Sequence, residues 1–336
     1  MPELLDLAAF PADQGELIKT PHGEYRKCRN YTEEGVCNWL VRTDSGSELC
    51  QACRLNRVIP NLGEPENRMR WQEVELAKRR LVYGLDALGL PVRSKLDDAE
   101  RGLSFDIKQT VDDERVLTGH ADGFITLNLD EADAPEREKM RVAMKERYRT
   151  LLGHFRHEIG HYFWDQLLAN SERLPAFRAL FGDERADYAK ALKQQYAAPP
   201  DPNYAARFIS AYAASHPWED FAETFAHYLH MVDTLETAAS YGIATGANAA
   251  DTEASPDPFE RLAAQWFRLT VVLNALNRSM GLADAYPFAI APPVKEKLRY
   301  VHDLIQAARR ASSEATFSSS TRAGPGTSEL SASTAV

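Results

Sequence analysis

The feature that most constrains this chain is the run His157-Glu158-Ile159-Gly160-His161, an H-E-x-x-H pattern within a segment of helical apolar spacing. Two His residues four positions apart lie on one face of a helix, so both imidazoles can bind a single Zn²⁺. Glu158 is one step round the helix, where it can contact a water bound to that zinc. The pattern is typical of a hydrolytic metal site. The alternative is two surface His flanking a solvated Glu.

A catalytic zinc takes three protein ligands and leaves one position for water, so a third ligand should lie downstream. The best candidate segment is 216–230, whose apolar residues recur at helical spacing and place Glu219 and Glu223 on one face. One carboxylate could bind the metal, and the other could accept the free N–H of a ligating His. His154 is expected to pair with a nearby carboxylate instead. The competing candidates for the third ligand are Glu223, His227 and Asp165.

The four Cys of the chain are close together in the sequence, and the last two form a C-x-x-C pair. They are Cys28, Cys37, Cys50 and Cys53. This clustering predicts a Cys₄ structural zinc, because a short unit with few large apolar residues needs a metal to fold. A redox C-x-x-C is less favoured, since no thioredoxin-like pattern surrounds it. Four unpaired thiols are the remaining alternative.

Charge narrows the possible partners. The formal net charge of −10 argues against a general nucleic-acid binder, whose surface would be basic. The Cys-rich part is locally basic through Arg26, Lys27, Arg29, Arg54 and Arg57. It could therefore bind a nucleic acid or an acidic protein, although an ordinary solvated surface is the favoured interpretation.

Membrane insertion and secretion are not expected. No run of 18 apolar residues is present, so the sequence predicts no membrane span. Residues 1–6 lack the basic start and the long apolar core of a secretory signal. These observations together predict a cytoplasmic protein.

The pattern along the chain predicts a mostly helical α+β fold in three parts. These are a Cys₄ module over 1–60, a large domain over 66–311 and a disordered Ser/Thr/Ala-rich tail over 312–336. Alternating segments predict strands at 103–107 and 123–129, with a turn at 119–123, and small residues predict a loop at 245–258. Helices are predicted over 66–88, 140–164, 177–182, 185–196, 204–214, 218–238 and 259–280.

Segments 148–162, 209–212 and 216–224 resemble the bacterial family described as "putative zinc-binding metallopeptidase". Members of that family carry an N-terminal zinc-ribbon-like piece. The resemblance implies a zincin-like (gluzincin) metallopeptidase domain with a small β-sheet, preceded by a zinc-ribbon-like module.

The segment Glu219-Asp220-Phe221-Ala222-Glu223 also resembles the third-ligand helix of gluzincin metallopeptidases. In these enzymes the first acid of an E-x-x-x-D/E segment binds zinc and the second supports it. The resemblance therefore implies Glu219 as the third ligand and Glu223 as its support. In one member a Tyr seven residues before the ligand Glu assists the transition state, which implies the same role for Tyr212.

Together these observations predict a zinc-dependent endopeptidase or related amide hydrolase with one catalytic and one structural zinc, acting on a peptide or protein. Glu158 would be the general base for a zinc-bound water, and Tyr212 would stabilise the oxyanion. One alternative is a non-catalytic regulatory protein that recognises a partner through its zinc ribbon. Another is a processing protease dedicated to one regulator. Strand 123–129 could be an exposed edge that binds extended substrate, or an ordinary core strand.

Overall fold

The structure, a computed structural model, describes residues 17–110, 116–143, 148–197, 201–243 and 256–322. Helices dominate and two small sheets complete the fold, which confirms the predicted mostly helical class. Residues 1–16 of the predicted Cys₄ module, and the predicted loop up to residue 255, lie outside the described residues. Within the described ranges, no helix has the length and apolar character needed to cross a membrane.

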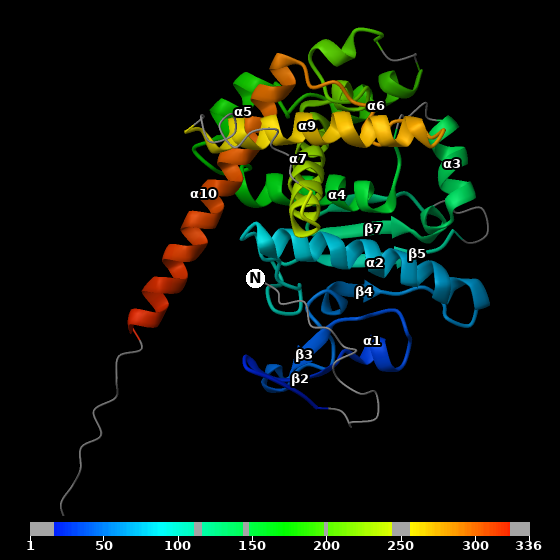
Figure 1. Cartoon of the computed structure of the whole chain (residues 1–336), viewed down its shortest axis with the longest axis vertical. Helices are drawn as coiled ribbons and strands as arrows, with labels where there is room; N and C mark the ends of the chain where they lie inside the picture. The colour runs from blue at the N-terminus through cyan, green and yellow to red at the C-terminus, as the bar shows by residue number, and fades with distance from the viewer. Residues whose placement is uncertain (1–16, 111–115, 144–147, 198–200, 244–255, 323–336) are drawn as a thin grey trace, which may run out of the picture.

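The N-terminal part is a three-stranded antiparallel sheet with the cysteines in the surrounding turns. Strand β1 (Ile18–Thr20) pairs with β2 (Gly23–Lys27), which pairs with β3 (Leu40–Arg42). The short helices here are α1 (Arg29–Thr32), η2 (Thr43–Ser45) and η3 (Cys53–Leu55). Figure 1 shows this part at one end of the molecule, with the second sheet next to it. Beyond the sheet lie helices α4 (Leu151–Leu167), α7 (Pro217–Ser240) and α9 (Pro258–Ser279).

The second sheet has the strand order β4-β5-β7-β6. Its strands are β4 (Asn56–Val58), β5 (Ser104–Lys108), β6 (Gly119–Ala121) and β7 (Phe124–Asn128). Strands β4, β5 and β7 are parallel, and helix α2 (Pro65–Ala87) connects β4 to β5, as a parallel pair requires. Although β4 lies within the predicted 1–60 module, it belongs to this sheet.

The hypothesis of an edge strand at 123–129 is wrong. Strand β7 lies between β5 and β6, and its residues Ile125 and Leu127 are fully buried. The edge strand on this side of the sheet is β6, in the stretch that the sequence predicted as a turn. The true turn is Asp122-Gly123, where both residues have positive φ. This compact turn leaves the preceding residues free to pair with β7.

The helices after the sheet build the larger part of the molecule. They are α3 (Ala134–Ala143), α4 (Leu151–Leu167), α5 (Leu174–Phe181), α6 (Tyr188–Ala197), α7 (Pro217–Ser240), α9 (Pro258–Ser279) and α10 (Pro292–Arg322), with single turns η4 (Leu129–Ala132), η5 (Tyr204–Ala206) and η6 (Ala213–Ser215). Helix α7 packs against α4, α5, α9 and α10, so it is the central helix of this part. The first half of α10 packs against α7, and its C-terminal half extends away from the body (Figure 1).

Two of the predicted helices are corrected. The helix predicted over 140–164 is divided, because Thr150 is extended and its hydroxyl accepts from the Gly153 N–H, which starts α4 at Leu151. The helix predicted over 204–214 is reduced to η5 and the start of η6. Backbone carbonyls there accept from side chains elsewhere: Lys297 bonds the Arg207 carbonyl and Gln195 bonds the Ala211 carbonyl.

The predicted disordered tail is corrected for its first part. Helix α10 continues over 312–322, because no Pro or Gly interrupts the sequence from residue 294 to residue 322. Residues 323–336 lie outside the described residues.

Helices α4 and α7 approach each other closely at Gly160, inside the H-E-x-x-H run. A Cβ atom at Gly160 would lie 2.9 Å from the Cα atom of Ala222 and 3.1 Å from its carbonyl oxygen. Real Cβ atoms essentially never come this close to backbone atoms, so only Gly allows the two helices to pack this way.

Gly160→Ala is therefore expected to lower the free energy of unfolding by about 1–2 kcal/mol, because overpacking outweighs the better helix propensity of Ala. Zinc affinity should fall as well, since the helices that carry the candidate ligands are pushed apart. Gly84→Ala in α2 is the matched control. Nothing lies within 4 Å of a Cβ atom there, so it should stabilise by about 0.5–1 kcal/mol. Equal stability of the two variants in urea unfolding would contradict this account.

Candidate metal centres

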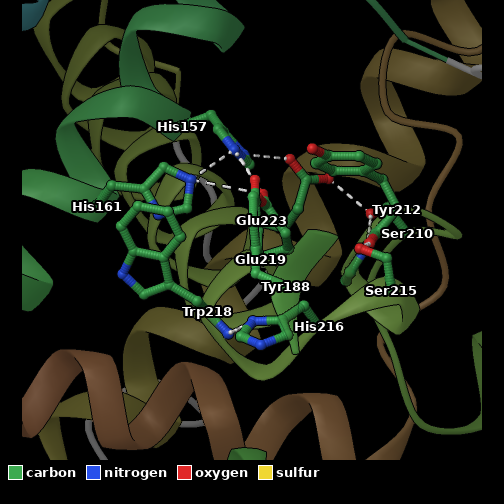
Figure 2. A network of polar contacts seen from close by, with 11 residues as sticks. His157, His161, Tyr188, Ser210, Tyr212, Ser215, His216, Trp218, Glu219 and Glu223 are labelled. Carbon is green, nitrogen blue, oxygen red and sulfur yellow. Dashed lines mark hydrogen bonds and ion pairs between the residues drawn. The ribbon is translucent and has the colours of Figure 1, made fainter. Parts of the chain in front are cut away.

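Helices α4 and α7 bring three metal-binding side chains together. His157 and His161 project from one face of α4, and Glu219 lies in the first turn of α7 (Figure 2). The Nε2 atoms of the two imidazoles are 3.1 Å apart. The Oε2 atom of Glu219 is 2.9 Å from the His157 Nε2 and 3.4 Å from the His161 Nε2.

These three distances suit a tetrahedral zinc. With Zn–N bonds of about 2.0–2.1 Å, neighbouring ligand atoms on a tetrahedron are about 3.3 Å apart. The Oε2 atom of Glu219 is buried and faces the Nε2 atoms of both imidazoles. When both Nε2 atoms are deprotonated, three acceptor atoms face one another, which is the arrangement that binds a cation.

Glu223 holds one of the imidazoles in place. Its Oε1 atom lies 2.8 Å from the His157 Nδ1, and its Oε2 atom accepts from the Ser210 hydroxyl at 2.6 Å. Burial acts to raise the pKa of Glu223, but the His157 imidazole outweighs burial and lowers it to about 2. Glu223 is therefore an anion that accepts from the Nδ1–H of His157 and leaves the Nε2 lone pair for a metal.

Glu158 lies beside this group without joining it. Only 8% of the residue is exposed, and its carboxylate makes no hydrogen bond or ion pair within the described part of the chain. Burial raises the pKa of Glu158 to about 7. A buried carboxylate of this kind, next to a metal site, is suited to take and release a proton near neutral pH.

Tyr212 also lies at the site. Its ring centroid is 5.8 Å from that of His157, and η6 begins directly after it. Burial and the negative charge of Glu219 raise the pKa of Tyr212, so its hydroxyl remains a hydrogen-bond donor at neutral pH.

The competing ligands are engaged elsewhere. The Nδ1 of His227 lies 2.9 Å from the Tyr286 hydroxyl, in the buried interior. Asp165 is 3.9 Å from the Nδ1 of His120 and is not part of the metal-binding group. His154 forms an ion pair with buried Glu131, as the sequence predicted.

Sequence analysis missed two residues that contact candidate ligands directly. Tyr188, the first residue of α6, donates its hydroxyl to the Glu219 Oε1 at 2.6 Å. Trp218 packs its ring against His161, with ring centroids 3.7 Å apart. Neither residue has a fixed sequence spacing to the H-E-x-x-H run. The one available signal is that Trp218 immediately precedes the candidate ligand Glu219.

The four cysteines form a second group that could hold a metal ion. Their Sγ atoms all lie within 4.8 Å of one another, and all four residues are buried and free of disulfides. Backbone N–H groups point at two of the sulfurs: Cys50 N–H at the Cys28 Sγ (3.3 Å) and Trp39 N–H at the Cys37 Sγ (3.4 Å). Such donors stabilise thiolates, the form in which Cys binds zinc.

The cysteine group is joined to α2 through buried polar side chains. The Cys53 Sγ lies 3.9 Å from Glu75 of α2. Glu75 accepts from Trp71 (3.1 Å), Asn56 (2.8 Å) and Lys78 (2.6 Å), and the Glu75 and Lys78 side chains are fully buried. The N-terminal part is thus packed firmly onto the second sheet and its crossover helix.

The basic residues of the N-terminal part are largely occupied by contacts within the chain. Arg29 pairs with Glu48, Arg54 with Asp97, and Arg57 with Asp106. Arg26 donates to the Ser47 carbonyl, and Lys27 lies over the Tyr31 ring. Carboxylates within the chain neutralise three of these five charges, which reduces the positive charge that this surface offers to an acidic partner.

Comparison with known proteins identifies two matching family models. The model described as "Putative zinc-binding metallo-peptidase" matches residues 67–304, and a zinc-ribbon domain model matches residues 1–64. An uncharacterized protein of Mycobacterium tuberculosis is 44% identical over 271 residues, which cover 80% of this chain and 79% of the relative. An uncharacterized protein of Mycobacterium bovis matches with the same identity and coverage. No solved structure matches the chain significantly.

Proposed function

Because the chain belongs to the family described as "Putative zinc-binding metallo-peptidase", we propose that it is a zinc-dependent peptidase that hydrolyses peptide bonds. The proposed catalytic zinc site consists of His157, His161 and Glu219, with Glu223 as the support of His157. A second, structural zinc is proposed at the four cysteines. The observation that carries the proposal is the convergence of three acceptor atoms beside the buried, unpartnered carboxylate of Glu158.

Three protein ligands leave one position of a tetrahedral zinc for water. Zinc bound there would lower the pKa of that water from about 15.7 to about 7 and polarise the scissile carbonyl. Glu158 accepts the proton that the attacking water loses and passes it to the leaving amine. Tyr212 donates a hydrogen bond to the negative charge that develops on the carbonyl oxygen of the substrate.

Strand β6 offers a place for an extended substrate. It is an edge strand of the second sheet and lies against α4. The ring of His120, in this strand, is stacked 6.5 Å from that of His161. A peptide that adds to this edge by backbone hydrogen bonds would lie close to the proposed zinc.

The second candidate is a non-catalytic regulatory protein that recognises a partner through its zinc ribbon. The Glu158 carboxylate argues against it, because a buried acid without a partner costs stability and serves no purpose in an inactive site. The internal pairing of three basic residues also reduces the charge that is free for partner binding.

Metal counting tests the proposed centre. Glu219→Ala is expected to lower the zinc content of the full chain from two ions to one and to abolish peptide hydrolysis, because two imidazoles alone hold zinc weakly. Elemental analysis and a library of fluorogenic peptides measure the two effects. Glu236→Ala, on the same helix, should keep both zincs. Two zincs in Glu219→Ala would contradict the ligand assignment.

The peptide library also tests how broad the substrate range is. Cleavage of only one or a few library sequences would indicate a dedicated processing protease.

A further inference from the structure

Tyr188 binds the proposed third ligand on the side away from the imidazoles. Its hydroxyl donates to the Glu219 Oε1 at 2.6 Å, whereas the Oε2 faces the imidazoles of His157 and His161 at 2.9 and 3.4 Å (Figure 2). The two oxygens of this carboxylate therefore have separate partners.

The side chain of Tyr188 is held in place by the start of α7. Its ring centroid is 5.2 Å from that of His216 and 5.8 Å from that of Trp218, both at nearly perpendicular angles. His216 is fixed in turn, since its Nδ1 accepts from the Trp218 N–H at 3.1 Å and its Nε2 lies 3.0 Å from the Ala186 carbonyl. Tyr188 thus meets Glu219 in a defined orientation, although the residue is partly exposed.

We propose that Tyr188 is a positioning residue that holds Glu219 to a single metal-binding oxygen and so keeps one position at the metal open for water. The inference rests on the proposed catalytic zinc site. A carboxylate can bind a metal through one oxygen or through both. When one oxygen is committed to a hydrogen bond, only the other is available.

The chemistry of the hydroxyl supports this role. A tyrosine phenol, whose ordinary pKa is about 10, is protonated at neutral pH and can donate. A protonated phenol next to an anionic carboxylate forms a strong, charge-assisted hydrogen bond. Tyr212 lies next to Tyr188, so the same phenol also helps to fix the surroundings of the proposed oxyanion donor.

Tyr188→Phe in the full chain, loaded with Co²⁺ in place of zinc, tests the proposal. Loss of the hydroxyl frees the Oε1 to bind the metal, which raises the coordination number, so the visible d–d absorption of the His/Glu site should weaken. Subtracting the spectrum of Co²⁺-loaded Glu219→Ala removes the contribution of the Cys₄ site. The value of kcat for a peptide substrate should fall by about 10- to 100-fold, as is typical when a supporting partner is lost, with KM little changed.

Two variants serve as controls. Tyr196→Phe makes the same change in the same helix at an exposed position, and it should leave both the spectrum and kcat unchanged. Tyr212→Phe should lower kcat without changing the spectrum, because Tyr188 still holds the Glu219 Oε1. Thermal unfolding of Tyr188→Phe checks that the fold is intact.

A wild-type difference spectrum in Tyr188→Phe would overturn the role of Tyr188, whatever its effect on kcat. If Glu219→Ala itself has the wild-type spectrum, Glu219 is not a ligand, and the proposed metal centre fails instead. The two failures can therefore be distinguished.

Discussion

Glu158→Gln is expected to lower kcat/KM for peptide hydrolysis by about 10²- to 10⁴-fold, the usual contribution of a general acid–base group. The zinc content should remain at the wild-type level, since the proposed ligands His157, His161 and Glu219 are untouched. The substituted amide has nearly the same shape as the carboxylic acid, but it cannot accept the proton of the attacking water. Stability should not fall, because the replaced carboxylate is buried and makes no hydrogen bond or ion pair within the described residues.

Elemental analysis, peptide cleavage and urea unfolding of the same preparation measure these three quantities. Glu172→Gln makes the same chemical change at an exposed position after α4 and should keep wild-type activity. Wild-type turnover by Glu158→Gln would exclude the proposed mechanism. Loss of zinc would instead indicate that Glu158 acts on the metal directly.

Cys50→Ala is expected to remove one zinc per chain and to unfold the N-terminal part. The buried hydrophobic side chains of residues 17–55 are the four cysteines and five aliphatic residues, with no buried aromatic ring, so the small core of this part depends on the metal. Structural zinc contributes about 10–16 kcal/mol to the folding of zinc-finger peptides, which is comparable with the whole stability of a domain, about 5–15 kcal/mol.

The effect should extend beyond the cysteines. Strand β4 begins three residues after Cys53 and is an edge of the second sheet, and buried Glu75 of α2 lies beside the Cys53 sulfur. Limited proteolysis should therefore cut the variant between residues 17 and 55 and should also release α2 more readily than in the wild type. Gln51→Ala, an exposed neighbour that bonds Asp86 at 3.1 Å, should keep both zincs and resist the protease. Two zincs and wild-type resistance in Cys50→Ala would show that this part folds without metal.

Much of the proposed centre could be predicted from the sequence, because its parts are local. The spacing of His157 and His161 places both on one helix face by the helical period alone, and the spacing of Glu219 and Glu223 does the same on a second helix. The four cysteines are similarly close in sequence. The structure brings each set together, with His157 Nδ1 2.8 Å from Glu223 and the four sulfurs within 4.8 Å of one another.

Sequence patterns were less informative about the position of a strand in its sheet and about the conformation of segment 204–214, because contacts with distant segments decide both. The period-2 alternation of 123–129 marks a strand, but it does not tell whether the strand is at the edge or in the middle of a sheet. Strand β6 on one side and β5 on the other place it inside. The stretch 204–214 has helical spacing, yet Gln195 and Lys297 take its carbonyls, and one of these partners lies 90 positions away.

The amino-acid sequence by itself determined the residue types that can bind metal and the faces of the helices on which they lie, since both follow from the helical repeat. Only the tertiary structure decided which oxygen of Glu219 faces the imidazoles, because that choice depends on Tyr188, 31 positions earlier in the chain. It also decided that the cysteine-bearing part is packed onto the second sheet, through the pairing of β4 with β5 and the burial of Glu75 and Lys78. Contacts between segments far apart in the chain depend on packing, and no local period encodes them.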